Sequence, residues 1–298
     1  MAVKTAETAS AIRRDAEKVS GSLPPLLVEA ERLVSTLMSG AHGRRRAGHG
    51  ETFWQYRAAQ PGDSLGQIDW RRSSKSDRLF VREMEWEAAE SVVLWCDRAR
   101  SMDFKSDKLD WTKQDRARLL TLSIAVLLQR AGERFGLLGG ELAKPRTGET
   151  QLMRIAANLA ATDHNAKDFG APPQGQLPKA GKAVFFSDFM GPRDAVFPSL
   201  LNAAGQGTGG IFVMILDPVE EEFPFTGRTR FESVARAVRH ETDEAGALRK
   251  EYLARLAERR ADLGKVAEQA GWQLLLHRTD ESPRKALVQL HGYLGGGQ

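Results

Sequence analysis

Residues Ser91 to Met102 read SVVLWCDRARSM, and this stretch decides the fold that the sequence predicts. The apolar run 92–96 is followed at once by Asp97 and then by small and polar residues. A short apolar run that ends in a polar turn is typical of a strand buried on both faces of a parallel sheet. A carboxylate at the carboxyl end of such a strand lies where open α/β sheets bind their ligands. The edge that contains Asp97 is therefore the first candidate for a functional site.

The same pattern recurs along the chain. Apolar runs at 183–186 and 211–216 end near Asp188 and Asp217, and a fourth candidate strand covers 272–277. Helical spacing of apolar residues predicts helices between the strands and after the last one, at 115–130, 152–161, 194–204, 245–270 and 282–295. This alternation predicts a Rossmann-like, doubly wound, mostly parallel sheet. In a parallel sheet the three aspartates share one edge.

Three local signals complete the predicted elements. Residues 26–38 follow two prolines and have apolar side chains at helical spacing, which predicts an amphipathic helix that packs on the domain. A helix that binds a membrane surface or a partner is the alternative. Gly139-Gly140 lies between two short apolar segments and predicts a β-hairpin. Thr150 is positioned to cap the helix that starts near Leu152.

The composition is that of an ordinary globular protein and excludes several classes. Hydrophobic residues make up 41% and charged residues 28% of the 298 residues, and the net charge is only +4. No apolar stretch approaches the roughly 20 residues that a membrane-spanning helix needs, so we expect a cytoplasmic protein. The single cysteine, Cys96, excludes an internal disulfide and a cysteine-rich zinc site. Its place in an apolar run predicts a core residue and not a nucleophile.

Residues 43–82 contain nine Lys or Arg residues against four acids, and aromatic residues lie among them. Basic and aromatic residues together are typical of surfaces that bind single-stranded nucleic acid. The alternative, which we expect, is that the arginines pair with the interspersed acids while the aromatic side chains fill a core. Residues 83–88 then alternate glutamates with Met84, Trp86 and Ala88, which predicts a half-buried antiparallel strand beside the central one.

Four oxygen-bearing residues, Asp97, Ser101, Thr150 and Asp188, come from three separate loops and are of the type that Mg²⁺ or Ca²⁺ prefers. They resemble the metal-ion-dependent adhesion site of von Willebrand factor A domains, whose first motif is Asp-x-Ser-x-Ser. In the present motif Ala99 replaces the middle serine, and a water could substitute for its hydroxyl. The alternative is that the two aspartates accept hydrogen bonds from loop amides and arginines.

A wider resemblance covers nearly the whole chain. Residues 43–87 resemble the signature of the bacterial domain-of-unknown-function family fifty-eight (DUF58), which precedes a von Willebrand factor A-like domain. The matching features are, in order, Tyr56-Arg57, Pro61-Gly62-Asp63, Ile68-Asp69-Trp70, Ser73-Ser74-Lys75 and Arg82-Glu83. The resemblance implies an N-terminal helix and Arg/Trp-rich extension in residues 1–90, packed on a von Willebrand factor A-like domain in residues 91–298.

The resemblance implies that the protein functions as an adaptor. Such proteins are commonly encoded beside MoxR-type AAA+ ATPases and are thought to act with them, and no catalytic activity is established for the family. We therefore expect a non-enzymatic module that grips an acidic group of a partner protein at the strand ends. The grip would be made through a divalent cation held by Asp97, Ser101, Thr150 and Asp188, or through Arg98 and Arg100.

Two other functions are weighed against the adaptor. One is nucleic-acid binding through residues 43–82. The other is a hydrolase or phosphoryl-transfer enzyme that uses Asp97 as a nucleophile, since strand-end aspartates do serve that role. The sequence contains no Gly-x-x-x-x-Gly-Lys phosphate loop and no Gly-x-Ser-x-Gly elbow, which argues against the enzyme.

Overall fold

The structure is a computed structural model, and it describes residues 25–40, 53–60, 68–74, 78–84, 90–161, 166–232, 234 and 239–295. The chain forms two compact units. The larger unit consists of Met1–His42 together with Glu90–Gln298, and the smaller unit is Gly43–Ala89. The expected packing of the segment 43–89 on the main domain stays a prediction, whereas the N-terminal residues up to His42 belong to the larger unit.

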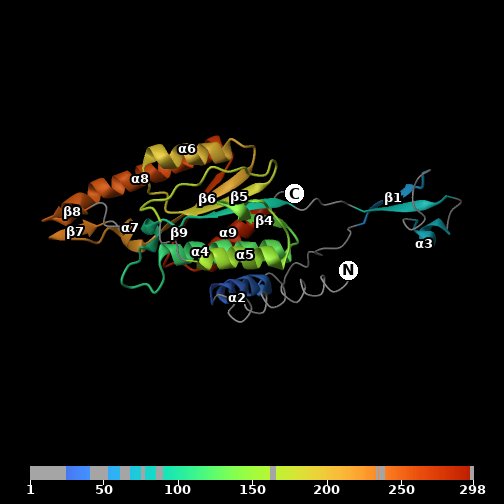
Figure 1. Cartoon of the computed structure of the whole chain (residues 1–298), viewed down its shortest axis with the longest axis horizontal. Helices are drawn as coiled ribbons and strands as arrows, with labels where there is room; N and C mark the ends of the chain where they lie inside the picture. Colours follow the sequence, from blue (N-terminus) through green and yellow to red (C-terminus); the bar gives the residue numbers. More distant parts are fainter. Residues whose placement is uncertain are drawn as a thin grey trace, which may run out of the picture. The chain divides into compact units, whose positions relative to one another are not determined.

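The larger unit is built on a parallel sheet of five strands (Figure 1). The strands are β3 (Ser91–Cys96), β4 (Arg134–Leu137), β5 (Lys182–Ser187), β6 (Gly209–Leu216) and β9 (Gln273–Arg278). Their order across the sheet is β4-β3-β5-β6-β9, and every neighbouring pair is parallel. The predicted doubly wound sheet is therefore confirmed. The apolar residues of β3, β5 and β6 are buried, as their continuous apolar runs predict.

Helices cover both faces of the sheet (Figure 1). One face is covered by α4 (Lys113–Arg130), α5 (Glu149–Ala160) and α9 (Pro283–Gly295), and the other by α6 (Arg193–Ala204) and α8 (Ala245–Gln269). Helix α2 (Pro25–Gly40) packs on α4, α5 and α9, so it adds a further layer outside the first face. Its buried residues Leu27, Ala30 and Val34 lie on one helical face, which confirms the predicted packing on the domain.

The strand order brings two strands together whose connections run to opposite faces of the sheet. Strand β3 is adjacent to β5, and it is followed by α4 on one face, whereas β5 is followed by α6 on the other face. In open α/β sheets, ligands bind outside the carboxyl ends of the strands at such a reversal. Asp97 follows β3 and Asp188 follows β5, so the fold places both aspartates at this position.

Two local predictions differ from the structure. The hairpin expected around Gly139-Gly140 is reduced to a single antiparallel bridge between Phe135 and Arg146, because residues Glu141–Ala143 form a 3-10 turn. Helix α5 begins one turn earlier than expected, at Glu149, with Gly148 as the preceding residue. Thr150 therefore lies inside the first turn of the helix and does not cap it.

A short antiparallel arm separates β6 from α8. It follows helix α7 (Pro218–Glu222) and consists of β7 (Thr229–Glu232) and β8 (Arg239–Thr242). Its base is an aromatic cluster in which ring centroids lie 4.7 to 5.6 Å apart, formed by Phe223, Phe225, Phe231 and Tyr252. These contacts fix the arm to the start of α8, because Tyr252 belongs to that helix.

The smaller unit contains β1 (Phe53–Ala58), α3 (Trp70–Ser73) and β2 (Phe80–Met84). Strand β2 contains the first two residues of the strand expected at 83–88, and it pairs with β1 in a separate two-stranded antiparallel sheet and not with the central strand. Several residues named in these predictions lie outside the described residues: Arg44, Arg45, Arg46, Pro61-Gly62-Asp63, Lys75, and residues 85–88 of the predicted strand.

The Ile-Asp-Trp motif of the smaller unit has a structural role. Asp69 caps α3 by accepting a hydrogen bond from the Arg72 amide (3.0 Å), and it accepts another from the Tyr56 hydroxyl (3.1 Å). Ile68 is buried, whereas Trp70 is 58% exposed, so the expectation that the tryptophan is buried was wrong. The Arg72 guanidinium lies 4.4 Å from the centre of the Tyr56 ring. This contact fits the structural interpretation of the basic and aromatic residues.

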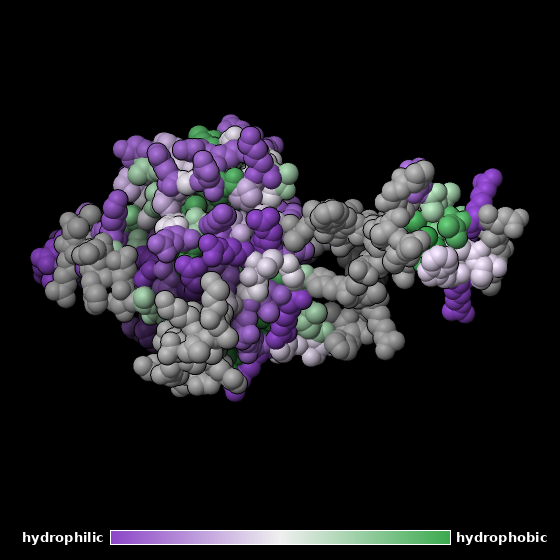
Figure 2. Space-filling model, turned by 45° about the vertical axis from the view of Figure 1, so that its right-hand side comes forward, coloured by the Kyte–Doolittle hydropathy of each residue, from purple (hydrophilic) through white to green (hydrophobic). Residues whose placement is uncertain are grey.

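The surface of the larger unit is mainly polar. In Figure 2 the visible face of this unit is mostly hydrophilic, and its hydrophobic residues form small separate spots. Within the described ranges, no helix has the length and apolar character needed to cross a membrane.

Candidate functional site

Asp97 lies at the carboxyl end of β3 and is held by the loops on both sides. Its Oδ1 accepts a hydrogen bond from the Ala99 amide (2.9 Å), and its Oδ2 accepts one from the Ser187 hydroxyl (2.6 Å). The Ser187 Oγ in turn accepts a hydrogen bond from the Phe189 amide (2.9 Å). Asp97 is only 2% exposed. Burial, with a smaller contribution from the charge of Asp188, raises the pKa of Asp97 to about 6.

A strap segment, residues 166–171, covers this carboxylate. The Arg100 amide donates to the Lys167 carbonyl (2.8 Å) and the Ser101 amide donates to the Asp168 carbonyl (2.8 Å), which fixes the strap to the loop after β3. Gly170 of the strap lies directly on Asp97, because a Cβ atom built at Gly170 would be 2.0 Å from Asp97 Oδ1. The strap therefore closes the space above the carboxylate from which a ligand would approach.

The second strand-end aspartate, Asp188, is neutralised by a lysine. Its Oδ2 lies 2.9 Å from Lys113 Nζ, and its Oδ1 accepts a hydrogen bond from the Met190 amide (3.0 Å). Lys113 Nζ also lies 2.6 Å from Oε1 of Glu220. The side chain of Lys113 is 1% exposed. Burial alone would lower the pKa of this ammonium, but the charges of Asp188 and Glu220 hold the pKa above its usual range.

The starts of two helices place the Lys113 ammonium and the Glu220 carboxylate in the site. Lys113 is the first residue of α4, after a capping box in which Thr112 and Asp115 satisfy each other's backbone amides. Glu220 lies in a second capping box at the start of α7, where Asp217 accepts from the Val219 amide and Glu220 accepts from the Asp217 amide. Lys113 and Glu220 were not among the residues predicted for the site, although the patterns Thr-x-x-Asp and Asp-Pro-x-Glu are sequence signals for helix starts.

The structure does not bring Thr150 to the other predicted ligands. Residue Gln151, next to Thr150, donates to the Phe135 carbonyl near the start of β4. The other end of α5 lies near β3's carboxyl end, because the Ala161 carbonyl accepts a 2.5 Å hydrogen bond from the Arg98 guanidinium. Thr150 is thus exposed at the opposite end of a helix of 12 residues.

The remaining predicted residues lie in the loop after β3. Ser101 belongs to a short 3-10 helix, Arg100–Asp103, and its hydroxyl is buried with no hydrogen-bond partner among the described residues. Arg98 is engaged by the last turn of α5, where a cation also favours the negative end of the helix dipole. The Arg100 side chain is exposed.

These residues do not fit a divalent cation. Both oxygens of Asp97 accept hydrogen bonds under Gly170, Asp188 is paired with Lys113, and Thr150 is at the far end of α5. No group of three or more His, Cys, Asp or Glu side chains within the described ranges is arranged to hold a metal ion. The hydrogen-bonded alternative for the two aspartates therefore accounts for their geometry, with a lysine in place of the expected arginines.

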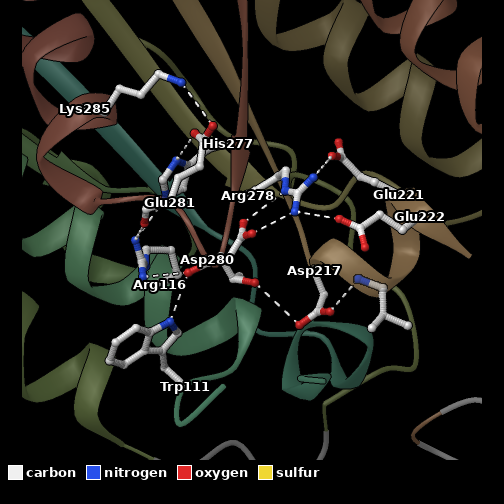
Figure 3. Close-up of polar contacts among 12 residues, drawn as sticks. Trp111, Arg116, Asp217, Glu221, Glu222, His277, Arg278, Asp280, Glu281 and Lys285 are labelled. Atoms are coloured by element: carbon white, nitrogen blue, oxygen red, sulfur yellow. Dashed lines mark hydrogen bonds and ion pairs between the residues drawn. The ribbon is translucent and has the colours of Figure 1, made fainter. Parts of the chain in front are cut away.

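A second buried network lies at the carboxyl end of β9 (Figure 3). Arg116 of α4 donates to the carbonyls of Thr279 (2.8 Å) and Glu281 (2.6 Å), and its Nη1 is 3.3 Å from His277 Nε2. The Trp111 indole also donates to the Thr279 carbonyl (3.0 Å). Burial, and then the charge of Arg116, lowers the pKa of His277 to about 4. The network joins the start of α4 to the loop before α9.

Comparison with known proteins identifies one family and two similar mycobacterial proteins. The family described as "Protein of unknown function DUF58" matches residues 55–262. The uncharacterized protein Rv1480 of Mycobacterium tuberculosis is 26% identical over 278 residues, which cover 89% of this chain and 86% of that protein. The uncharacterized protein Mb1516 of Mycobacterium bovis has the same identity and coverage. No solved structure is significantly similar. Because the match spans more than half of the chain, this protein belongs to the DUF58 family.

Proposed function

We propose that this protein is a non-enzymatic interaction module that binds an acidic segment of a partner protein at the carboxyl edge of its sheet. The observation that carries the proposal is the position of Arg100. Its side chain is exposed beside the reversal between β3 and β5, and its amide is bonded to the carbonyl of Lys167, which is exposed as well. Two cationic side chains on adjoining segments suit a carboxylate-bearing partner.

The geometry of Asp97 favours binding over catalysis. A nucleophilic carboxylate must reach the substrate, whereas Asp97 is 2% exposed and lies under Gly170. Asp188 is likewise occupied by Lys113. Acidic groups of a partner would therefore meet Arg100 and Lys167, and no divalent cation is needed to bridge them.

We further propose that the domain is of von Willebrand factor A type and that the partner is a MoxR-type AAA+ ATPase. The parallel sheet and the order of the sequence motifs support the first statement. The second rests on the family resemblance, and it makes the protein an adaptor of that ATPase. Nucleic-acid binding is less favoured, since Arg72 packs on Tyr56 and Asp69 is used within its own unit.

The test is a binding titration of the purified protein with the MoxR-type ATPase of the same organism, in the presence of EDTA. We expect saturable binding that weakens with added salt. Reversal of the charges in Arg100→Glu/Lys167→Glu should weaken binding at least about tenfold, since like charges across an interface repel. The matched control is Arg134→Glu, an exposed arginine at the start of β4, on the opposite edge of the sheet.

Two outcomes would overturn the proposal. If the wild-type protein does not bind the ATPase, the adaptor role is wrong. If the double variant and the Arg134→Glu control bind as tightly as the wild type, the carboxyl edge is not the binding surface.

A further inference from the structure

The Lys113 ammonium occupies an unusual position for a lysine. It lies among the strand-end loops with 1% of its side chain exposed, 2.9 Å from Asp188 Oδ2 and 2.6 Å from Glu220 Oε1. The side chains of these two acids are 2% and 18% exposed. The ring of Phe104 faces the same ammonium at 5.8 Å. A cation with two carboxylates is thus enclosed at the edge where open α/β sheets bind their ligands.

A lysine in this position needs an explanation, because lysine normally keeps its charged end in water. Moving a lysine ammonium and its carboxylates out of water costs free energy. Their mutual attraction offsets this cost only when the geometry of the ion pairs is good. Each carboxylate of the pair is supported by a backbone amide, Met190 for Asp188 and Asp217 for Glu220. The backbone therefore holds both carboxylates in place, and Lys113 supplies the positive charge of the cluster.

Two contacts of Lys113, those to the carboxylates of Asp188 and Glu220, are of the kind that a hard divalent cation makes. Magnesium in proteins is bound through one or two carboxylates, with water completing its coordination. Asp188 and Glu220 are two such carboxylates, and Asp97 is joined to the residue before Asp188, because its Oδ2 accepts a hydrogen bond from the Ser187 hydroxyl (2.6 Å). The difference is that the ammonium is attached to α4 and leaves no open coordination position for a ligand.

We propose that Lys113 is the resident cation of this edge, and that Asp188 and Glu220 form a latent divalent-cation site from which the ammonium excludes the metal. The proposal goes beyond the binding function above and needs no partner for its test. A result on the isolated protein therefore stands apart from the success or failure of the ATPase titration.

The experiment is a calorimetric titration of Mn²⁺ and Mg²⁺ into the wild type, Lys113→Ala and Lys113→Met, with circular dichroism to follow folding. The wild type should bind neither ion at this edge, and EDTA should leave its thermal unfolding unchanged. Lys113→Ala should bind one Mn²⁺ per chain at least about tenfold more tightly than the wild type, because a positive charge has been removed from between two carboxylates.

Lys113→Met is the matched control. It removes the same charge, but its thioether side chain fills the volume that the ion and its waters would occupy. It should therefore bind no Mn²⁺, and Mn²⁺ should raise the unfolding temperature of Lys113→Ala alone. In Lys113→Ala, the added change Glu220→Gln should abolish the binding again.

Several results would overturn the proposal. One is that the wild type binds Mn²⁺ and Lys113→Ala binds it no more tightly. Another is that Lys113→Ala is folded but binds no ion. A third is that Lys113→Ala and Lys113→Met bind Mn²⁺ equally well. If Lys113→Ala is unfolded, Mn²⁺ should restore its folding, and a chain that stays unfolded at saturating Mn²⁺ would also count against the latent site.

Discussion

Gly170 lies so close to Asp97 that a single added carbon would collide with the carboxylate. A Cβ atom at Gly170 would be 2.0 Å from Asp97 Oδ1 and 2.3 Å from Cγ. The absence of a side chain at this residue is what allows the strap to cover the carboxylate. The strap also reaches the loop after β5, since a Cβ at Gly191 would lie 3.2 Å from the Gly170 carbonyl oxygen.

Substitution of Gly170 by alanine should displace the strap. We expect Gly170→Ala to lower the free energy of unfolding by about 1 to 3 kcal/mol, the usual cost of forcing extra volume into a packed site. The matched control is Gly264→Ala in α8, where an added Cβ meets nothing within 4 Å. That change should raise the free energy of unfolding by about 0.5 to 1 kcal/mol, because alanine favours the helix. Equal effects of the two changes in urea denaturation would contradict the strap contact.

The raised pKa of Asp97 makes a prediction for the pH dependence of stability. With a pKa of about 6 in the folded protein and 3.8 as the ordinary value, Asp97 binds its proton more tightly in the folded state. Its contribution to stability is fully present below the ordinary pKa and is lost as the pH rises through about 6, at a cost of about 3 kcal/mol. Asp97→Asn cannot titrate and should lack this loss.

The measurement is urea denaturation of the wild type and Asp97→Asn across this pH range. The difference in unfolding free energy, variant minus wild type, should increase as the pH rises. Curves that stay parallel would show that Asp97 keeps its ordinary pKa.

The titration of His277 should change the free energy of unfolding with pH in the opposite direction to that of Asp97. Its pKa is lowered from 6.5 to about 4 by burial and by Arg116, so the imidazole resists protonation in the folded protein. Stability should therefore be lost as the pH falls from 6.5 towards 4, by about 3 kcal/mol in total. In His277→Gln this acid-dependent loss should disappear. Because Asp97 and His277 oppose each other in the same range, each effect must be measured as a difference between wild type and variant.

Cys96 should be unreactive in the folded protein. It is 5% exposed, and burial raises the pKa of its thiol to about 12. The thiolate is the form that attacks thiol reagents, and with this raised pKa it is scarce at mildly alkaline pH. A chromogenic disulfide reagent should detect no thiol in the native protein and one per chain in urea, since the chain has one cysteine. Rapid reaction of the native protein would place Cys96 outside the core.

The strands and the residues at their ends could be predicted because their signal is local. An apolar run followed by a polar residue places Asp97, Asp188 and Asp217 at the ends of β3, β5 and β6 without any knowledge of long-range contacts. The rule for parallel sheets then puts all three at one edge. The prediction that Cys96 belongs to the core follows from the same run and is confirmed by its burial.

The partners of these aspartates could not be predicted, because they depend on the path of the chain between elements. Thr150 was expected at the carboxyl edge, but the chain turns back after β4 and starts α5 at the other end of the sheet. The meeting of Lys113 with Glu220 joins residues 107 positions apart. Capping boxes predict that both residues lie in first turns of helices, but they do not predict that these turns converge. No sequence signal identifies Gly170 as the residue that lies on Asp97.

Lys113 also has a consequence for how the edge acquires its charge. A bound ion has to be captured from the surroundings after folding, and it can be lost to a chelator or replaced by a competing metal. The ammonium of Lys113 is synthesised with the polypeptide, at the start of α4, in a fixed ratio of one per chain. The positive charge that Lys113 gives this edge is therefore set by translation, and it does not depend on the supply of metal ions in the cell.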